Sequence, residues 1–229
     1  MFELTNVSKI YRKRQQSVTA FQADHLSVAD GEYVAVVGPS GCGKTTLLSM
    51  LGGMLSPDSG QVQLNGVSLY DLSVTERAKL RRERIGFVFQ TFNLLPYLTA
   101  LENVQVPLYL SGSEQSAART KAAALLEAVG LGERLDHKPC ELSTGQQQRV
   151  ALARTLANDP TVILADEPTG NLDPDSRAHI LSMFDEFVHA GKTIVMVTHD
   201  RAAAQRANRQ LKLNDGQLRV EERIAKFVA

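Results

Sequence analysis

Three runs of apolar, mostly β-branched residues stand out along the chain because they lack any alternation of polar and apolar positions. They span residues 34–37, 162–165 and 193–198. Strands that are covered on both faces have this pattern, since neither face meets water. We therefore predict that these runs are central parallel strands, and residues 85–89 are a further candidate strand.

Two segments have the pattern of β-hairpins instead. An Asn-Gly pair lies within residues 61–69 and an Asp-Gly pair lies within residues 211–220. Both pairs tolerate positive φ, which tight turns between antiparallel strands require. The expected fold class is therefore α/β, with a parallel central sheet and a flanking antiparallel β subdomain.

The middle of the chain, residues 91–158, has a different character. Apolar positions recur at helical spacing in residues 116–129 and again in residues 145–157. Ser143 and Gln146 have the form of a capping box, so the second helix is expected to begin at Ser143. We predict that this part is a helical insertion.

Composition and charge narrow the class of protein. The 229 residues are 43% hydrophobic, and 25 Lys+Arg balance 25 Asp+Glu. This length supports a folded core, and the neutral charge provides no global positive field for nucleic acid. No repeat or linker separates the parts. We therefore predict one domain over residues 1–229, with residues 1–90 and 159–229 as the catalytic core and residues 91–158 as the helical subdomain.

The location of the protein can also be predicted. No apolar run approaches the ~20 residues of a membrane-spanning helix. The N-terminus has no charged start followed by an apolar stretch, and Cys42 and Cys140 offer no disulfide framework. We expect a protein of the reducing cytoplasm that does not itself cross a bilayer.

A segment rich in small residues connects the first predicted strand to a helical-looking stretch. It reads Gly38-Pro39-Ser40-Gly41-Cys42-Gly43-Lys44-Thr45. Small residues let backbone N–H groups turn inward around a polyphosphate, and the following helix points its positive end at the anion. The pattern predicts a phosphate loop, with Lys44 on the β- and γ-phosphates and Thr45 on Mg²⁺. The alternative is a Gly-rich turn with a surface lysine.

The predicted nucleotide contacts of this segment are the loop residues and the first residues after them. They are Gly38, Ser40, Gly41, Cys42, Gly43, Lys44, Thr45 and Thr46. Cys42 is interpreted as a small loop residue, because no Cys/His pattern makes it a nucleophile.

A second motif is an apolar strand that ends in two adjacent carboxylates, Asp166 and Glu167. Alternation along a strand points neighbouring side chains in different directions, so the two can have different tasks. Asp166 would support Mg²⁺, and Glu167 would act as general base on a water in line with the γ-phosphate. The alternative is that both carboxylates only cap the next turn.

The stretch Leu142-Ser143-Thr144-Gly145-Gln146 resembles the signature motif of the nucleotide-binding subunits of ABC transporters. The resemblance covers residues 1–220 and rests on motifs in the family's order. These are the phosphate loop, Gln90, the signature, Asp166-Glu167, Asn171-Leu172-Asp173 and His199.

The resemblance implies an ATPase that closes as a head-to-tail dimer of two copies. Ser143 and the backbone of Gly145 would touch the γ-phosphate held by Lys44 of the other chain, and Gln146 is expected beside them. Asp173 would contact the partner subunit and couple the two sites.

The resemblance also implies roles for residues that would contact the ATP held by their own chain. Gln90 would meet Mg²⁺ or the attacking water, and His199 would contact the γ-phosphate, so both are catalytic candidates with Glu167. Tyr11 stands where the family stacks an aromatic ring on adenine. A structural histidine and a surface tyrosine are the plainer alternatives.

Thr144 departs from the family, which usually has glycine there. A β-branched residue costs roughly 1–2 kcal/mol at positive φ, and otherwise its methyl would only crowd the γ-phosphate. We expect a working but weaker closure of the dimer.

Further segments resemble the lipoprotein-release and macrolide-export branch of the family, notably residues 89–96 and 101–104. This implies a peripheral ATPase at the cytoplasmic face of the inner membrane. It would drive a separate transmembrane permease in the export or extraction of a lipoprotein, lipid, peptide or drug. The permease is expected to dock near residues 90–98, whose apolar stretch could equally be core.

Two other functions share the same motifs. An ATP-gated mechanical regulator of a cell-division or sensor complex would use the same engine without transport, and the sequence does not separate it from an exporter. A DNA-repair ATPase would need a long coiled coil or zinc modules, and the short insertion lacks sustained heptads. We therefore expect no nucleic-acid partner. Cargo, direction and the identity of the permease stay open.

Overall fold

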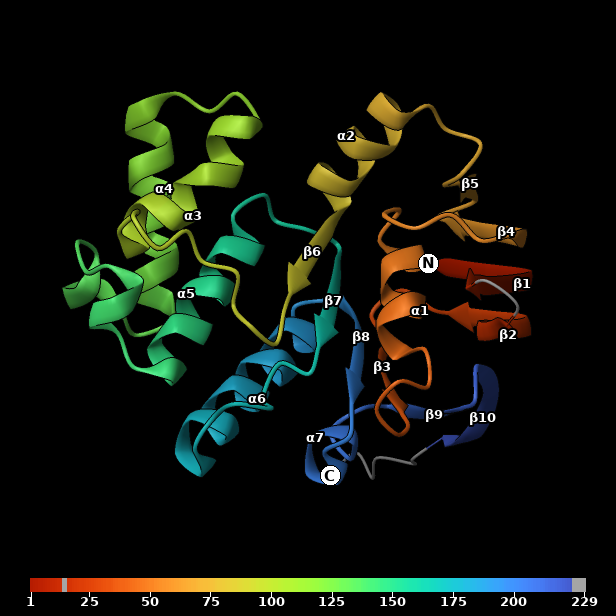
Figure 1. The fold of residues 1–229 in the computed structure, drawn as a ribbon. Coiled ribbons are helices and arrows are strands. Elements are labelled where there is room, and N and C mark those ends of the chain that lie inside the picture. Colours follow the sequence, from red (N-terminus) through yellow and green to blue (C-terminus); the bar gives the residue numbers. More distant parts are fainter. Residues whose placement is uncertain (14–15, 224–229) are drawn as a thin grey trace.

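The computed structural model describes residues 1–13 and 16–223. In this part of the chain, ten strands form one mixed sheet in the order β5-β4-β1-β2-β10-β9-β3-β8-β7-β6 (Figure 1). The sheet has a parallel half and an antiparallel half, as the sequence predicts. The α/β fold class is therefore confirmed.

The parallel half contains the predicted central strands. It consists of β3 (Tyr33–Val37), β6 (Ile85–Val88), β7 (Val162–Asp166), β8 (Thr193–Thr198) and β9 (Arg209–Asn214). Within this half, neighbouring strands run parallel to one another. All six residues of β8 are buried, because helices cover both faces of the sheet here.

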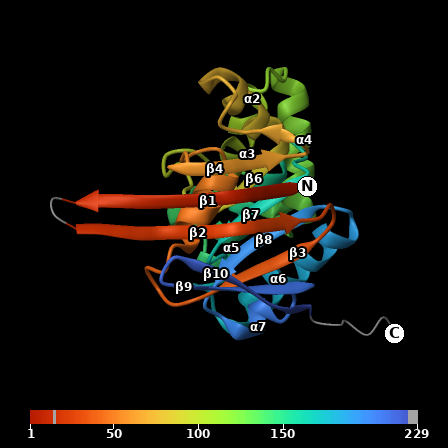
Figure 2. The same cartoon turned by 90° about the vertical axis from the view of Figure 1, so that its right-hand side faces the viewer.

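The antiparallel half contains both predicted hairpins. It consists of β1 (Phe2–Lys13), β2 (Gln16–Val28), β4 (Ser59–Leu64), β5 (Val67–Ser68) and β10 (Gln217–Arg223). β4 and β5 pair across Asn65-Gly66, and β9 and β10 pair across Asp215-Gly216, with positive φ at all four turn residues. The long hairpin of β1 and β2, which was not predicted, projects from the body of the molecule (Figure 2).

Among the described residues, four helices accompany the sheet and three more form a separate group. Those at the sheet are α1 (Lys44–Leu51), α2 (Val74–Arg84), α6 (Pro174–His189) and α7 (Arg201–Ala204). The group consists of α3 (Ala100–Leu110), α4 (Gln115–Ala128) and α5 (Thr144–Leu156), with the short 3₁₀ turns η1 (Gly132–Arg134) and η2 (Pro139–Glu141).

Helices α3, α4 and α5 pack against one another and lie on the side of the sheet away from the antiparallel strands (Figure 1). Leu101, Leu126 and Val150, one from each helix, are fully or almost fully buried in a shared core. Leu126 and Val150 belong to the two runs of apolar positions at helical spacing from which the insertion was predicted. Helix α5 also contacts β6 and α6, so it stands between this group and the sheet.

Two cores meet at the parallel strands because alternate side chains point to opposite faces. Ile163 and Ala165 belong to the core shared with α5 and α6, whereas Val162 and Leu164 belong to the core under α1. The strand ends are therefore held from both faces, which fixes the loops that leave them. Within the described residues, no helix is long and apolar enough to span a membrane.

Candidate active site

The phosphate loop connects β3 to α1, and its backbone leaves no room for larger residues. A Cβ atom on Gly38 would lie 2.1 Å from the carbonyl oxygen of Leu213, and one on Gly43 would lie 1.8 Å from that of Ala20. Gly43 also has a φ of 106°, in the left-handed region that favours glycine. The loop conformation thus requires these two glycines.

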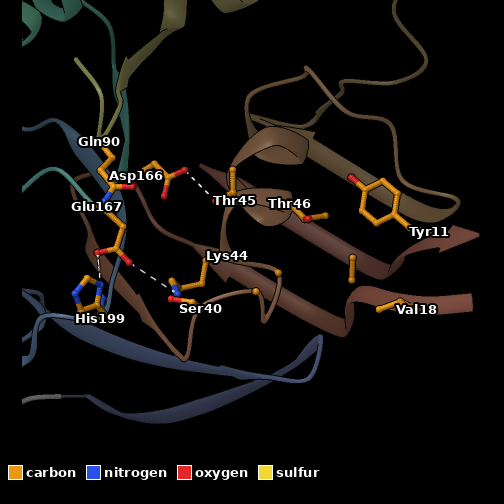
Figure 3. A pocket seen from close by; sticks show the side chains of 13 residues that line it. Tyr11, Val18, Ser40, Lys44, Thr45, Thr46, Gln90, Asp166, Glu167 and His199 are labelled. Atoms are coloured by element: carbon orange, nitrogen blue, oxygen red, sulfur yellow. Dashed lines mark hydrogen bonds and ion pairs between the residues drawn. The ribbon is translucent and has the colours of Figure 1, made fainter. Parts of the chain in front are cut away.

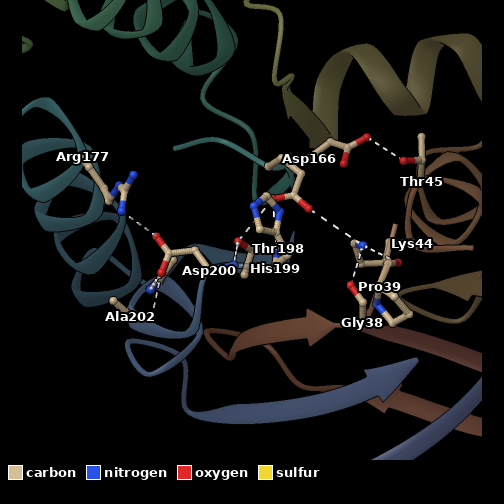
Figure 4. Close-up of polar contacts among 12 residues, drawn as sticks. Gly38, Pro39, Lys44, Thr45, Asp166, Arg177, Thr198, His199, Asp200 and Ala202 are labelled. Carbon is tan, nitrogen blue, oxygen red and sulfur yellow. Dashed lines mark hydrogen bonds and ion pairs between the residues drawn. The ribbon is translucent and has the colours of Figure 1, made fainter. Parts of the chain in front are cut away.

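Lys44, in the first turn of α1, binds back to the start of the phosphate loop. Its Nζ donates hydrogen bonds to the carbonyl oxygens of Gly38 at 2.8 Å and Pro39 at 3.0 Å. The side chain is buried, and Nζ lies 3.9 Å from Oε1 of Glu167. A positive charge is thereby held at the loop and beside the carboxylate pair (Figure 4).

Asp166 ends β7 and faces the start of α1. Its Oδ2 accepts a hydrogen bond from Oγ1 of Thr45 at 3.0 Å. Burial raises the pKa of Asp166, and the neighbouring charge of Glu167 adds to this, while the Thr45 hydroxyl opposes it. The Thr45 hydroxyl oxygen at the start of α1 and an Asp166 carboxylate oxygen at the end of β7 thus lie together beside the phosphate loop.

Glu167 follows at φ 46°, a left-handed conformation that is unusual for a residue with a side chain. Its backbone N–H donates to the carbonyl of Val197 at 2.9 Å, and its Oε2 contacts Nδ1 of His199 at 2.8 Å. The turn at the end of β7 therefore aims Glu167 away from Asp166, toward Lys44 and His199 (Figure 3). Such strained residues cluster at functional sites.

The position of His199 is fixed by the residues around it. Asp200 caps α7 through the N–H of Ala202 at 2.8 Å and pairs with Arg177 of α6 at 3.4 Å. Thr198 Oγ1 accepts from the Asp200 N–H at 3.0 Å. His199 itself is 64% exposed, so its ring can meet a ligand from solvent.

These side chains line one cavity of about 490 Å³ (Figure 3). Its walls are Tyr11, Val18, Ala20, Ser40, Gly41, Gly43, Lys44, Thr45, Thr46, Gln90, Asp166, Glu167 and His199. All but Val18 and Ala20 were predicted from the sequence. Val18 pairs with Tyr11 across the β1–β2 hairpin, so only recognition of that hairpin and its register would have found it.

Two predicted loop residues lie outside the cavity walls. The Cys42 side chain is buried in the core, and the Gly38 carbonyl accepts from Lys44. In the structure, Cys42 thus packs in the core beneath the loop and Gly38 binds Lys44, so both residues support the loop itself.

The signature residues lie elsewhere, at the start of α5. Ser143 Oγ accepts from the Gln146 N–H at 3.2 Å, and Oε1 of Gln146 accepts from the Ser143 N–H at 2.9 Å. Gly145 lies against α6, where a Cβ would be 2.2 Å from Oγ of Ser176. The predicted capping box is confirmed, but Ser143, Gly145 and Gln146 do not line the cavity.

Thr144 is the first residue of α5 and does not have positive φ. Of the two alternatives for Thr144, backbone strain at positive φ is therefore excluded, and crowding of the γ-phosphate by its methyl group stays a prediction. Asp173, also outside the cavity, caps α6 by accepting from the N–H groups of Asp175 and Ser176. Hydrogen bonds from Ser176 lower the pKa of Asp173.

The apolar stretch after Gln90 divides into two parts. Phe92 and Leu94 are half-buried against the helical core, whereas Leu95 and Tyr97 are 46% and 86% exposed. Ordinary packing thus explains the first two residues and leaves the last two unexplained.

A phosphate loop after a parallel strand, with a carboxylate pair at the end of another, defines a phosphate-loop nucleoside triphosphatase. Residues 21–170 match the ABC transporter family model. The chain belongs to the ABC transporter family, and it is an ATP-binding, ATP-hydrolysing cassette of that family.

Similar proteins include members of two transport systems. The chain is 49% identical over 214 residues to LolD, the lipoprotein-releasing system ATP-binding protein of Xanthomonas campestris, covering 93% of this chain and 90% of that protein. It is 45% identical over 218 residues to the macrolide export ATP-binding/permease protein MacB of Hyphomonas neptunium, covering 95% of this chain and 34% of that protein.

A solved structure with the same fold is the dimeric post-hydrolysis state of the ATP-binding cassette MJ0796, bound to ADP and Pi. It superposes with a TM-score of 0.92 at 41% identity, covering 99% of this chain and all of that one. The predicted family and fold are thereby confirmed.

Proposed function

We propose that two copies of this chain close head to tail over two ATP molecules and drive a transmembrane permease subunit. The observation that carries the proposal is the separation of the predicted site residues. Lys44, Glu167 and His199 share one cavity, whereas Ser143 and Gly145 lie outside it at the start of α5. A cavity that lacks the signature is half of a site, and a second copy supplies the other half.

The dimeric solved structure of MJ0796, a cassette 41% identical to this chain and bound to ADP and Pi, supports a dimer. In our proposal, the free N–H groups and the positive end of α5 face the γ-phosphate held in the other copy. Gln146 keeps Ser143 in place through the capping box, and Asp173 meets the partner copy.

Within each cavity the residues divide the chemistry. Lys44 and the loop N–H groups hold the phosphates, and Tyr11 stacks on the base. A water attacks the γ-phosphorus and gives its proton to Glu167, while the bond to the β-phosphate oxygen breaks and ADP leaves. His199 orients the Glu167 carboxylate through the 2.8 Å contact and reaches the γ-phosphate.

Three oxygen-bearing side chains fit Mg²⁺, which prefers oxygen ligands. The Thr45 and Asp166 oxygens lie 3.0 Å apart, and Gln90 lines the same cavity. When bound there, the metal would neutralise phosphate charge. These residues hold it, and Gln90 links its site to the helical group.

The permease is proposed to dock in a groove. Elements α2 and β6 line one side of this groove, and α3 and α5 line the other. Its volume is about 550 Å³. It combines apolar and cationic side chains, including Met54, Arg81, Phe87, Phe89, Leu110 and Arg154. Leu95 and Tyr97 expose further apolar surface in the predicted docking stretch. We propose a peripheral location at the cytoplasmic face of the inner membrane and a lipoprotein, lipid, peptide or drug as cargo.

Replacing Glu167 by Gln tests the mechanism. We expect turnover to fall about 10²–10⁴-fold, the usual value of a general base. ATP should then hold the variant as a stable dimer, visible by size-exclusion chromatography with light scattering. Lys44→Ala is the matched control, because it should remove both turnover and ATP-driven dimerisation. Near-normal turnover of Glu167→Gln would remove this residue from the role.

A further inference from the structure

Helix α5 is attached to two loops of its own chain by long polar side chains. Nε2 of Gln148 donates to the carbonyl oxygen of Pro168 at 2.6 Å. Nη1 and Nη2 of Arg154 donate to the carbonyl oxygens of Asn93 at 2.6 Å and Phe92 at 2.7 Å. Neither Gln148 nor Arg154 lines the ATP cavity.

Both attachments end on loops that carry residues of the cavity. Pro168 directly follows Glu167, and Phe92 and Asn93 come shortly after Gln90. The loops are also conformationally costly. Phe92, Asn93 and Glu167 have φ values of 58°, 48° and 46°, a region that side chains disfavour and that persists only when the surroundings impose it.

Burying the amide group of Gln148 carries an energetic penalty. The side chain is fully buried, and its Oε1 has no hydrogen-bond partner among the described residues. An unpaired buried acceptor is destabilising, and an apolar residue of the same length would avoid that penalty. Among the described residues, the hydrogen bond to Pro168 is the only one that the amide makes, so we take holding that loop to be the function of Gln148.

The same helix presents the signature at its other end. Ser143 caps α5, and the helix continues without interruption to Leu156. Helix α5 also packs on α3, α4 and β6. We infer that this continuous helix shifts as one unit. A displacement of the Gln90 or Glu167 loop would therefore shift the Ser143 end.

We propose that Gln148 and Arg154 are positioning residues that couple the two ATP sites of the dimer. They tie the loops of Glu167 and Gln90 to α5, so that ATP in a chain's own cavity sets where its signature stands in the partner's site. This rests on the proposed head-to-tail dimer. Because coupling between sites is reciprocal, each bound ATP favours the second.

The test compares ATP hydrolysis against ATP concentration in the full chain and two variants, Arg154→Ala and Gln148→Met. Methionine keeps the length of Gln148 and removes both its donor and its unpaired oxygen. For the wild type we expect a Hill coefficient that approaches about 2, the number of sites, and for each variant one near 1. Binding of a fluorescent ATP analogue to the monomer should change less than about twofold, because the cavity walls are intact.

Arg149→Ala is the matched control on the same helix. Its guanidinium donates to the carbonyls of Val129 and Gly130, away from both cavity loops. The control removes comparable bonds and should retain the wild-type Hill coefficient. If Arg154→Ala yields too little folded protein, Arg154→Lys replaces it, since lysine keeps the charge but cannot reproduce the two-pronged contact.

The outcomes separate the inference from the function it rests on. Folded variants that keep the wild-type Hill coefficient overturn the coupling while leaving the dimeric ATPase intact. An equal fall in Arg149→Ala also overturns it, because any weakening of α5 would then suffice. A wild type with neither cooperative hydrolysis nor ATP-driven dimerisation overturns both proposals.

Discussion

Helices α3 and α5 pack against each other and begin with the same kind of cap, but the caps differ by one charge. In α3, Thr99 and Glu102 exchange hydrogen bonds at 2.8 and 3.2 Å. In α5, Ser143 and Gln146 do the same at 2.9 and 3.2 Å. Glutamate adds a negative charge at the positive end of its helix, and glutamine does not. The start of α5 therefore stays available to an anion.

The comparison extends to the other α-helices of the described residues. Helices α2, α3, α4, α6 and α7 each carry an acidic residue at the N-cap or in the first turn, whereas α1 and α5 carry none. These two are the helices proposed to face the phosphates. An uncompensated helix start is thus the feature that the two halves of the composite site share.

We expect the largest effect on dimerisation when the glutamine of the α5 cap is replaced by glutamate, the residue found in the α3 cap. Gln146→Glu should preserve the capping box and slightly stabilise the helix, but it places a carboxylate where the γ-phosphate must approach. Like charges a few ångströms apart should weaken ATP-driven dimerisation by at least about tenfold. Light scattering in a Glu167→Gln background measures this, and the thermal midpoint serves as the folding control. Undiminished dimerisation would mean that α5 does not face the nucleotide.

Removing the N-cap side chain of each helix separates its effect on stability from its effect on ATP turnover. Ser143→Ala and Thr99→Ala should each lower the free energy of unfolding by about 1 kcal/mol, because each leaves one N–H group unpaired. Only Ser143→Ala should also reduce ATP turnover. Denaturant unfolding and a steady-state ATPase assay on both variants make the distinction. Equal losses of turnover would assign Ser143 to stability alone.

A smaller effect is expected from the reverse charge change. Glu102→Gln in α3 should lower the free energy of unfolding by about 0.3–1 kcal/mol, through the lost interaction with the helix dipole. Turnover should not change, since α3 does not reach the ATP cavity. A large drop in turnover would show that the charge at α3 matters to the site.

The smallest effect is expected at Thr144. Since this residue is helical and lacks positive φ, Thr144→Gly relieves no strain and should cost at most about 1 kcal/mol of stability. Dimerisation and turnover should be unchanged. A clear rise in ATP-driven dimerisation would instead show that the threonine methyl crowds the γ-phosphate.

Much of this account could be predicted from the sequence because the informative segments are locally determined. The buried strands lack alternation, the turns need positive φ, and Ser143 with Gln146 has a cap pattern. The glycines of the phosphate loop lie directly between a predicted strand and a helical-looking stretch. Each of these signals lies within a few residues of the feature it predicts.

The parts that were missed depend on contacts between distant segments. The β1–β2 hairpin has no Gly-containing turn signal, so neither it nor Val18 at the cavity was predicted. The roles of Gln148 and Arg154 appear only when α5 is packed against loops 20 and 61 residues away in sequence. The sequence left open whether Thr144 has positive φ, and the structure excludes it because the helix begins early enough to include this residue.

In our proposal each ATP site is built from two chains, and a complementation experiment with two damaged variants tests this. Lys44→Ala damages the cavity, and Ser143→Glu damages the signature while keeping a helix-compatible charge at the start of α5. Each variant alone should be inactive. Mixed in equal amounts, they should recover up to about a quarter of wild-type turnover, because half of the dimers hold one intact site of two. No recovery in a mixture that forms mixed dimers would contradict the claim.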